Sequence, residues 1–407
     1  MTGSGVPFVS ELFALPTMTE SRPFRQMSDR HSRKICLSGL ALLALAVAPA
    51  MLAAEPRSFE VRALETASET TANASIADLN GDGHPDIVLV KGRHWPLKTV
   101  VLLGDGKGNF APGPALPGDP SRSYSAPLAD LNGDGHLDFI LSNDRPDAKL
   151  VFLGDGRGNF RQSGTFGAPT WPTRNAVVAD LNGDGFPDIA VANRGSSSYV
   201  CFNDGKGNFP TSTELGPETS STLVACDMDG DGSTDLIVGF RDKGQCVIYF
   251  NDGRGRFPRK VGFGPKVTST RALAVADMNK DGRLDIIACH EELGTFIYLN
   301  QGGGVFAAGM QISGADAVPY SLAAADLDGD GAPEIIVGFI RAPGVIFWND
   351  GSGRKFSQSN FGDGKGGTYG LAVADLNHDG LMDFVAARSD APSLLFLQTK
   401  PAKLTTK

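Results

Sequence analysis

Cysteine is scarce in this sequence. It supplies only 5 of the 407 residues, which argues against a disulfide framework in a domain of this size. Beyond the N-terminal segment, four remain: Cys201, Cys226, Cys246 and Cys289. Their spacing matches no zinc-binding pattern, and each lies in a predicted strand, which favours small buried side chains. The sequence leaves open whether any of them pair.

Helical patterning is equally sparse. Beyond the N-terminus, no convincing stretch places apolar residues at i, i+3, i+4 and i+7. The chain also lacks a phosphate-binding loop, a nucleophile elbow, a histidine-rich metal cluster and a lysine-rich stripe, so we expect no nucleotide or nucleic-acid partner. Glycine, in contrast, is abundant, with 51 residues beside 25 prolines and no collagen triplet. This composition predicts many tight turns and an all-β protein.

Residues 1–54 have the organisation of a secretory signal peptide. A positive flank that includes Arg25 and Lys34 precedes a short apolar run over 35–47, and small residues follow it. The run lies late for a chain that starts at Met1, and a start at Met27 would give a signal of ordinary length. The alternative is an uncleaved membrane anchor over 35–54. We therefore expect an exported protein, which is secreted, periplasmic or on the cell surface, and membrane-bound only if this segment is retained.

A repeated acidic motif organises the rest of the chain. In its first copy the motif reads ADLNGDGHPDI, and a second marker of the type NDGxGxF follows about 30 residues later in the unit. A fixed period near 50 residues is typical of a propeller or a solenoid. The seven motifs begin at Asp78, Asp130, Asp180, Asp227, Asp277, Asp326 and Asp375, at intervals of 52, 50, 47, 50, 49 and 49 residues.

Each repeat is predicted to form four short strands, which is the composition of a propeller blade. After Asp375 the last unit has three strands before the chain ends, so its fourth strand must come from elsewhere. Phe59 precedes Asp78 by 19 residues, and the marker phenylalanines of the other units precede their next acidic motif by 18 to 20 residues. We therefore predict that 57–64 completes the last blade and removes its open edge. The fold prediction is a single seven-bladed β-propeller over 55–400, with a tail over 401–407.

The acidic motif has the chemistry of a calcium site. In the first copy, oxygen-bearing side chains stand at positions one, three, five and nine, as Asp78, Asn80, Asp82 and Asp86. His84 at position seven can add its backbone carbonyl. Such an oxygen-rich cage suits a hard cation. The seven loops hold half of the 46 acidic residues, so the net charge of −9 reflects these sites and says little about partners.

The whole span from Arg57 to Gln398 resembles the FG-GAP, or VCBS-type, repeat family, whose best-known members are the integrin α-chain propellers. The resemblance implies calcium bound in the loops between strands one and two, with up to seven structural ions. Glu334 departs from the pattern at position nine, which puts the shape of that site in doubt. Loop by loop, the implied ligands are Asp78, Asn80, Asp82, His84 and Asp86; Asp130, Asn132, Asp134, His136 and Asp138; Asp180, Asn182, Asp184, Phe186 and Asp188; Asp227, Asp229, Asp231, Ser233 and Asp235; Asp277, Asn279, Asp281, Arg283 and Asp285; Asp326, Asp328, Asp330, Ala332 and Glu334; and Asp375, Asn377, Asp379, Leu381 and Asp383.

Basic and aromatic residues recur on what should be the opposite face. Positively charged side chains follow the second strand of each repeat, beginning with Arg93 and His94, and aromatic or basic residues stand six positions before several acidic motifs. Guanidinium groups bind carboxylate and sulfate, so these residues predict a site for an anionic ligand; the alternative is a set of solvated loop charges. The candidate ligand-binding residues are Arg145, Arg174, Arg194, Arg241, Arg271, Arg341, Arg388, Tyr124, Tyr320 and Tyr369.

Three functions fit this sequence. The first is a monomeric, non-catalytic binding or adhesion module outside the cytoplasm, which takes an anionic glycan or an acidic protein surface. The second is a polysaccharide lyase or sugar dehydratase with its active site on the same face, because such chemistry needs cations and a proton carrier. The third is a structural surface protein. The candidate proton carriers for an enzyme are Tyr124, Tyr320, Tyr369, His94 and His290.

Overall fold

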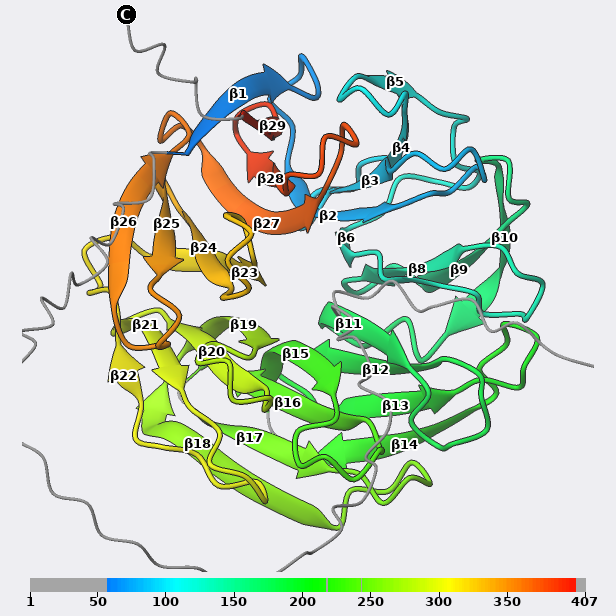
Figure 1. Cartoon of the computed structure of the whole chain (residues 1–407). Helices are drawn as coiled ribbons and strands as arrows, with labels where there is room; N and C mark the ends of the chain where they lie inside the picture. The colour runs from blue at the N-terminus through cyan, green and yellow to red at the C-terminus, as the bar shows by residue number, and fades with distance from the viewer. Residues whose placement is uncertain (1–56, 217–218, 243, 400–407) are drawn as a thin grey trace, which may run out of the picture.

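The computed structural model describes residues 57–399 except 217–218 and 243. The predicted signal peptide over 1–54 and the tail over 401–407 lie outside these residues. Seven antiparallel sheets stand around a central axis like the blades of a propeller (Figure 1). All regular elements in the described part of the chain are β-strands, so the predicted fold is confirmed.

The blades follow the chain in order, and the innermost strand of each comes first. Blade one contains β2 (Thr71–Ala77), β3 (Asp86–Lys91), β4 (Val100–Gly104) and β5 (Phe110–Pro112); blade two contains β6 (Ser123–Ser125), β7 (Leu128–Ala129), β8 (Asp138–Asn143), β9 (Lys149–Gly154) and β10 (Phe160–Phe166); blade three contains β11 (Thr173–Ala179), β12 (Asp188–Asn193), β13 (Ser198–Phe202) and β14 (Thr211–Gly216). Blade four contains β15 (Ser220–Cys226), β16 (Asp235–Phe240), β17 (Gly244–Phe250) and β18 (Arg259–Thr268); blade five contains β19 (Thr270–Ala276), β20 (Asp285–His290), β21 (Gly294–Tyr298) and β22 (Met310–Gln311); blade six contains β23 (Pro319–Ala325), β24 (Glu334–Phe339), β25 (Gly344–Asn349) and β26 (Phe356–Phe361); blade seven contains β27 (Gly367–Ala374), β28 (Asp383–Ser389), β29 (Leu394–Thr399) and the N-terminal β1 (Ser58–Ala63).

Blade two has an interrupted first strand. Its inner edge is split into β6 and β7, which both pair with β8. Pro127 lies in the gap between them, and proline has no N–H to donate to a sheet ladder. The interruption is therefore a local consequence of one residue, and the blade keeps its place in the ring.

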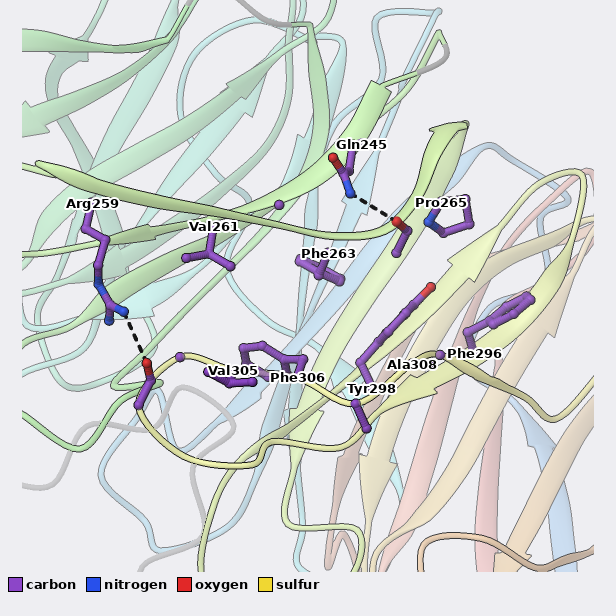
Figure 2. A pocket seen from close by; sticks show the side chains of 16 residues that line it. Gln245, Arg259, Val261, Phe263, Pro265, Phe296, Tyr298, Val305, Phe306 and Ala308 are labelled. Carbon is purple, nitrogen blue, oxygen red and sulfur yellow. Dashed lines mark hydrogen bonds between the residues drawn. The ribbon is translucent and has the colours of Figure 1, made fainter.

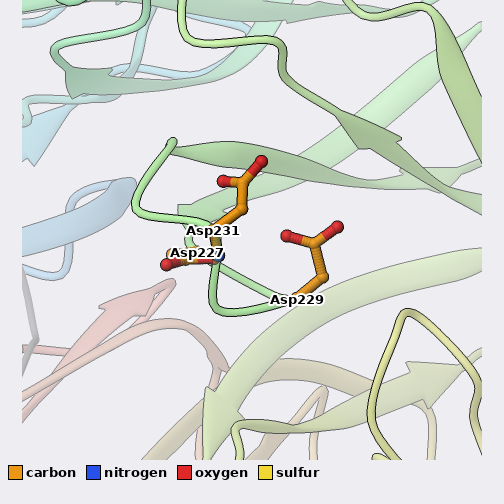
Figure 3. A group of neighbouring side chains, drawn as sticks. All are labelled: Asp227, Asp229 and Asp231. Carbon is orange, nitrogen blue, oxygen red and sulfur yellow. The ribbon is translucent and has the colours of Figure 1, made fainter.

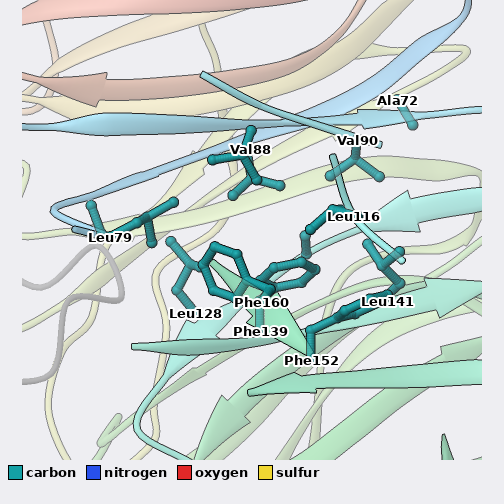
Figure 4. Packing of buried hydrophobic residues seen from close by; sticks show 13 residues of the cluster. Ala72, Leu79, Val88, Val90, Leu116, Leu128, Phe139, Leu141, Phe152 and Phe160 are labelled. Atoms are coloured by element: carbon teal, nitrogen blue, oxygen red, sulfur yellow. The ribbon is translucent and has the colours of Figure 1, made fainter. Parts of the chain in front are cut away.

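The hydrophobic core is a ring of seven layers, one at each interface between neighbouring blades. The layer between blades one and two illustrates the packing (Figure 4): Val88 and Val90 of blade one face Phe139 and Phe152 of blade two. The two phenylalanine rings are stacked, with centroids 4.9 Å apart. Because each blade contributes to two layers, the second strands are buried on both faces and carry continuous apolar runs.

The N-terminal strand closes the ring as predicted. β1 pairs antiparallel with β29, in a register that places Phe59 opposite Gln398 (Figure 1). The Phe59 ring packs edge-on against Phe384, with centroids 5.2 Å apart, and also contacts Phe396. Beyond the strand, the backbone N–H of Leu64 donates to the carbonyl of Ser393 at 2.9 Å. Blade seven therefore unites the two ends of the described chain.

The four cysteines of the propeller are free and buried, in line with their expected role as small packing residues. Burial raises the pKa of the Cys201 and Cys289 thiols to about 12, so neither is a reactive thiolate. No helix in the described part of the chain is long and apolar enough to cross a membrane.

Candidate functional site

The acidic loops join strands one and two of each blade, so all seven lie on one face of the ring. The first loop shows how the sequence folds this turn. One carboxylate oxygen of Asp78 accepts the N–H of Gly81 at 2.7 Å, and the other accepts the N–H of Gly83 at 2.8 Å. Both glycines have a positive φ, of 76° and 85°, which a residue without Cβ adopts without strain. The Asp-Gly spacing therefore shapes a loop whose carboxylates gather on one side.

The acid at position nine has a different role from the others. Asp86 is fully buried, and its two oxygens accept the N–H groups of Leu79 and Gly104, each at 2.8 Å. The carboxylate thus fastens the acidic loop to the end of the third strand, and the same pair of bonds recurs in all seven blades. Burial raises the pKa of this group, to about 7 for Asp138 and to about 8 for Glu334. Each position-nine acid is thus buried, whereas the aspartates at positions one and five of the same loops are not.

Two loops bring several carboxylates together closely enough to share one ion. Oxygen atoms of Asp227, Asp229 and Asp231 lie within 4.8 Å of one another (Figure 3), as do those of Asp326, Asp328 and Glu334. These are the loops with an aspartate rather than an asparagine at position three. One oxygen of Asp229 is buried without any hydrogen-bond partner. An unsatisfied oxygen among convergent carboxylates fits a hard cation such as calcium.

The other five loops carry asparagine at position three. In the first, Asn80 donates its side-chain N–H to Asp82 at 2.9 Å, while its oxygen accepts the N–H of Asp82. With asparagine at position three, these five loops hold one negative charge fewer than the loops that carry Asp229 and Asp328. The fifth loop differs again, because Arg283 donates to Asp281 at 2.5 Å and places a cation of the protein beside the position-five ligand. The seven loops share one backbone shape but differ in the charge available to an ion.

The turn between strands three and four supplies a contact that the sequence analysis missed. In blade three, the side-chain N–H of Asn203 donates at 2.9 Å to the carbonyl of Leu131, which lies in the acidic loop of the preceding blade. The residue at the start of this turn makes the equivalent bond in blades four to six, through Asn251, Asn300 and Asn349, and Gln398 near the end of β29 makes it in blade seven. The repeated asparagine before Asp-Gly was the available signal. These bonds tie each of these loops to its neighbour.

The opposite face carries a compact group of basic and aromatic residues, here called the mouth cluster: Arg93, Tyr124, Arg174, Arg241, Arg271, Tyr320 and Tyr369. Arg93 occupies its centre and is only 7% exposed. Its guanidinium carbon lies 3.6 Å from the ring centroid of Tyr369 and 5.1 Å from that of Tyr320, and it donates to the Tyr320 hydroxyl at 2.7 Å. No carboxylate forms an ion pair with Arg93 among the described residues. Aromatic rings thus hold a buried cation in place.

Acidic partners offset some of the positive charge near the cluster. Arg174 pairs with Asp144 at 2.8 Å, Arg271 pairs with Glu291, and Arg194, at the rim, pairs with both oxygens of Asp242 at 2.9 and 3.0 Å. Asp144, Glu291 and Asp242 are not among the residues predicted from the sequence. Their spacing along the chain gives no regular signal, since they lie in loops of unequal length.

Arg241, unlike Arg174, Arg194 and Arg271, has no acidic partner among the described residues. In the described part of the chain its guanidinium has no hydrogen bond and no ion pair. Burial and the neighbouring cation of Arg271 lower its pKa, which indicates a site with excess positive charge. The Arg271 side chain is only 7% exposed, and its Nε has no hydrogen-bond partner. Two guanidinium groups therefore retain unused N–H donors in one place.

The remaining candidates lie in different surroundings. Arg388 is buried, donates to the carbonyl of Pro392 at 2.7 Å and pairs with Asp363, so it fastens a loop. His290 is fully buried between Thr270 and Tyr298, and burial lowers its pKa to about 4. Neither is available at the mouth.

Three further candidates occupy the edge of this face. Arg145 and Arg341 are exposed and lie outside the contacts of the mouth cluster. His94 joins the cluster through Tyr124, whose hydroxyl lies 3.2 Å from its Nδ1, and burial together with Arg93 lowers the pKa of His94. The structure thus replaces a predicted ring of equivalent arginines with one asymmetric cluster.

Two cavities accompany these surfaces. The central channel holds a cavity of about 370 Å³, which is lined by first-strand residues and includes Arg271, Tyr320 and Tyr369 at the mouth. A second cavity of about 650 Å³ opens between blades four and five (Figure 2), where Phe263, Val305 and Phe306 line it. It exists because the outermost strand of blade five, β22, has only two residues. The loose turn NQGGGVF of this repeat was the only sequence signal for it.

Comparisons with known proteins agree with this architecture. The sequence pattern described as FG-GAP-like repeat matches six segments, 78–141, 130–191, 180–238, 227–288, 290–337 and 340–386. No curated protein matches the sequence.

Similar solved structures include two lectins and one protein complex. The BP39L lectin from Burkholderia pseudomallei has a TM-score of 0.61 and 14% identity, over 83% of this chain and 99% of that one. A lectin from Agrocybe aegerita is described as recognising non-reducing terminal N-acetylglucosamine. It has a TM-score of 0.54 and 23% identity, over 72% of this chain and 80% of that one. BBS1N, solved in complex with ARL6DN, has a TM-score of 0.59 and 11% identity, over 87% of this chain and 99% of that one. At these identities the likeness establishes the fold alone.

Proposed function

Because the chain belongs to the FG-GAP-like repeat family, we propose that it is an exported binding module that takes an anionic glycan at the mouth cluster and is held in shape by calcium in its acidic loops. The observation that carries the ligand class is Arg241, whose guanidinium has no ion pair among the described residues and whose pKa is lowered by burial and by the neighbouring cation of Arg271. A carboxylate or sulfate group would pair with Arg241 and offset the excess positive charge. The signal-peptide pattern of 1–54 supports export.

The aromatic residues favour a glycan over a simple anion. Tyr320 and Tyr369 stand edge to face at 4.4 Å, and Trp95, two residues after Arg93, is 69% exposed. Aromatic rings beside cations can stack on sugar rings while guanidinium groups bind their acidic substituents. The lectins among the similar structures support this choice. An acidic protein surface is the other ligand that such a cluster could take, and BBS1N with its protein partner is the corresponding structural relative.

Replacement of Arg241 tests the ligand class. We expect Arg241→Ala to weaken binding of a uronate-rich or sulfated polysaccharide by roughly 10- to 150-fold, because a charged hydrogen bond contributes about 1.5–3 kcal/mol. Binding should also lose part of its dependence on salt. The melting temperature should stay unchanged, since this guanidinium makes no contact that the fold needs. Isothermal titration calorimetry at two salt concentrations measures both effects.

The matched control is Arg341→Ala, which removes the same charge from an exposed position outside the cluster. Equal losses in both variants would mean that only net charge matters, which contradicts a specific site. If the wild-type protein binds acidic proteins but no anionic glycan, the protein-binding alternative holds. If it binds neither, the chain is a structural surface protein.

A second candidate function, a uronate lyase, is favoured by one specific observation. Burial alone would raise the pKa of Tyr320, but the cations of Arg93, Arg271 and Arg241 outweigh it and lower the pKa. A hydroxyl that ionises more readily beside arginines has the properties of a base for proton abstraction next to a carboxylate.

Tyr320→Phe separates the two functions. In a binding module the ring still stacks, so affinity should change less than about threefold. In a lyase the variant should bind substrate and lose nearly all turnover, measured as the ultraviolet absorbance of unsaturated uronate products. Tyr369→Phe, in the adjoining ring, is the control. Absence of any product with the wild-type protein on all uronate polymers would exclude the lyase.

A further inference from the structure

Position four of the acidic loop is left-handed throughout the propeller. Five loops place glycine there, and φ of the first, Gly81, is 76°. The other two loops carry Lys280 and His378 at this position, with φ of 59° and 57°. A side chain is disfavoured in this conformation. Its presence at two positions, where the other repeats use glycine, calls for a gain elsewhere.

In the first three loops position four lies against the following blade. A Cβ added to Gly81 would stand 3.3 Å from the carbonyl oxygen of Gly156 in blade two, and one added to Gly183 would stand 2.8 Å from that of Gly253 in blade four. Lys280 uses this placement, because its ammonium donates at 2.7 Å to the carbonyl of Asp330 in blade six. A side chain at position four is therefore a contact between blades.

His378 makes this contact with a second histidine. Its Nε2 lies 3.0 Å from Nδ1 of His84, at position seven of the first loop, and the ring centroids are 5.1 Å apart. His378 is exposed and His84 is half-buried. Both rings lie over Gly106, where an added Cβ would approach His84 and His378 too closely. Two imidazole nitrogens thus face each other at the surface, at the seam between blades seven and one.

This separation matches two ligands of one metal ion. Imidazole nitrogens bind late first-row metals at about 2.0–2.1 Å, so nitrogens 3.0 Å apart subtend about 90° at a shared ion. An angle near 90° is that of neighbouring ligands in the square-planar or tetragonal geometry of Cu²⁺ and Ni²⁺. The other coordination positions face solvent and can take water. Without a metal, one of these nitrogens donates its hydrogen to the other across the 3.0 Å contact. On metal binding the donor ring would take its other neutral tautomer, with the hydrogen on the outward nitrogen, so that both inward lone pairs bind the ion.

We propose that His84 and His378 form a binding site for a divalent transition metal, Cu²⁺ or Ni²⁺, that links the first and last blades. The two residues are 294 positions apart in the chain, so the metal would join the N-terminal and C-terminal halves of the ring. Calcium prefers oxygen ligands, so it would use the backbone carbonyl of His84, whereas the transition metal would use the ring nitrogens. The site is separate from the mouth cluster and from the glycan proposal.

Copper titration of the calcium-saturated protein tests the site. We expect one tight Cu²⁺ ion, an electron paramagnetic resonance spectrum with splitting from two nitrogens, and a melting temperature about 3–5 °C higher at a hundredfold excess over Kd. His84→Asn and His378→Gly should each lose the two-nitrogen splitting and weaken copper binding by at least the roughly 10- to 100-fold that loss of a supporting partner costs. His378→Gly also restores the glycine of the other repeats, so it should fold and melt no lower than wild type without copper.

The matched control is His136→Asn. His136 occupies position seven of the second loop and lies against Gly156 as His84 lies against Gly106, but the loop that faces it carries Gly81 at position four. This variant should keep the tight ion and both spectral features. The proposal is overturned if His378→Gly retains the two-nitrogen spectrum, or if His136→Asn loses copper affinity as strongly as His84→Asn.

Discussion

Removal of calcium is expected to lower the melting temperature of this protein by roughly 10–20 °C. A site at a hundredfold excess of ligand over Kd contributes about 2.7 kcal/mol, and the proposal places up to seven such sites in one cooperative ring. Without the ion, groups such as Asp227, Asp229 and Asp231 hold like charges within 4.8 Å, which opposes closure of the loop. Differential scanning calorimetry before and after chelation, with excess calcium added back, measures the effect.

The stability of the metal-free protein should also depend on pH. In the metal-free protein the pKa of Asp138 is raised to about 7 and that of Glu334 to about 8, above the value near 4 that an unfolded chain has. Between about pH 4 and pH 7 the folded state therefore binds more protons than the unfolded state, so stability falls as pH rises. Surface acids with a lowered pKa, such as Asp105 at about 2, titrate below this window.

Metal-free protein should accordingly melt at a higher temperature at pH 5 than at pH 8. Calcium-loaded protein should show the opposite order, because protons compete with the ion for the same carboxylates. An identical melting curve with and without calcium at pH 8, once elemental analysis has verified metal removal, contradicts a structural role for the ion. A metal-free sample that gains stability toward pH 8 contradicts the argument from burial.

The ring itself could be predicted because its evidence lies in spacing along the chain. The acidic motifs recur in phase, and the 19 residues from Phe59 to Asp78 fall within the 18 to 20 that separate corresponding residues in the other repeats. Neither observation depends on where side chains point. The pairing of β1 with β29 follows from that arithmetic alone.

The mouth cluster could be predicted only in part, because it depends on side-chain direction in loops of unequal length. Arg388 and Arg241 both stand near the end of the second strand of their repeats, yet Arg388, inside β28, pairs with Asp363, while Arg241, just after β16, has no ion pair among the described residues. His290 ends its strand fully buried, although the pattern placed it with the surface residues. Asp144 and Glu291 are acidic, so the pattern of recurrent basic residues did not predict them. Periodicity thus identifies the face of the propeller, and individual contacts decide which residues form the site.

Deletion of 55–65 is expected to abolish cooperative folding. The deletion removes β1 and with it every backbone bond to β29, so 394–399 becomes an open sheet edge. It also uncovers Phe384 and Phe396, whose rings pack against Phe59 at centroid distances of 5.2 and 6.3 Å. An exposed edge beside exposed aromatic rings favours association between chains. Size-exclusion chromatography should detect oligomers or aggregates, and calorimetry should show no sharp transition.

Two point variants on the same strand separate packing from strand pairing. Phe59→Ala should lower the free energy of unfolding by about 2–4 kcal/mol, because it leaves a cavity between the rings of blade seven. Val61→Ser replaces a residue on the same strand that is 50% exposed. It should change the free energy of unfolding by less than about 0.5 kcal/mol. Both variants keep the β1–β29 ladder and should stay monomeric, whereas the deletion should not. A truncated protein that remains monomeric and melts as cooperatively as the full chain would mean that the ring closes without its N-terminal strand.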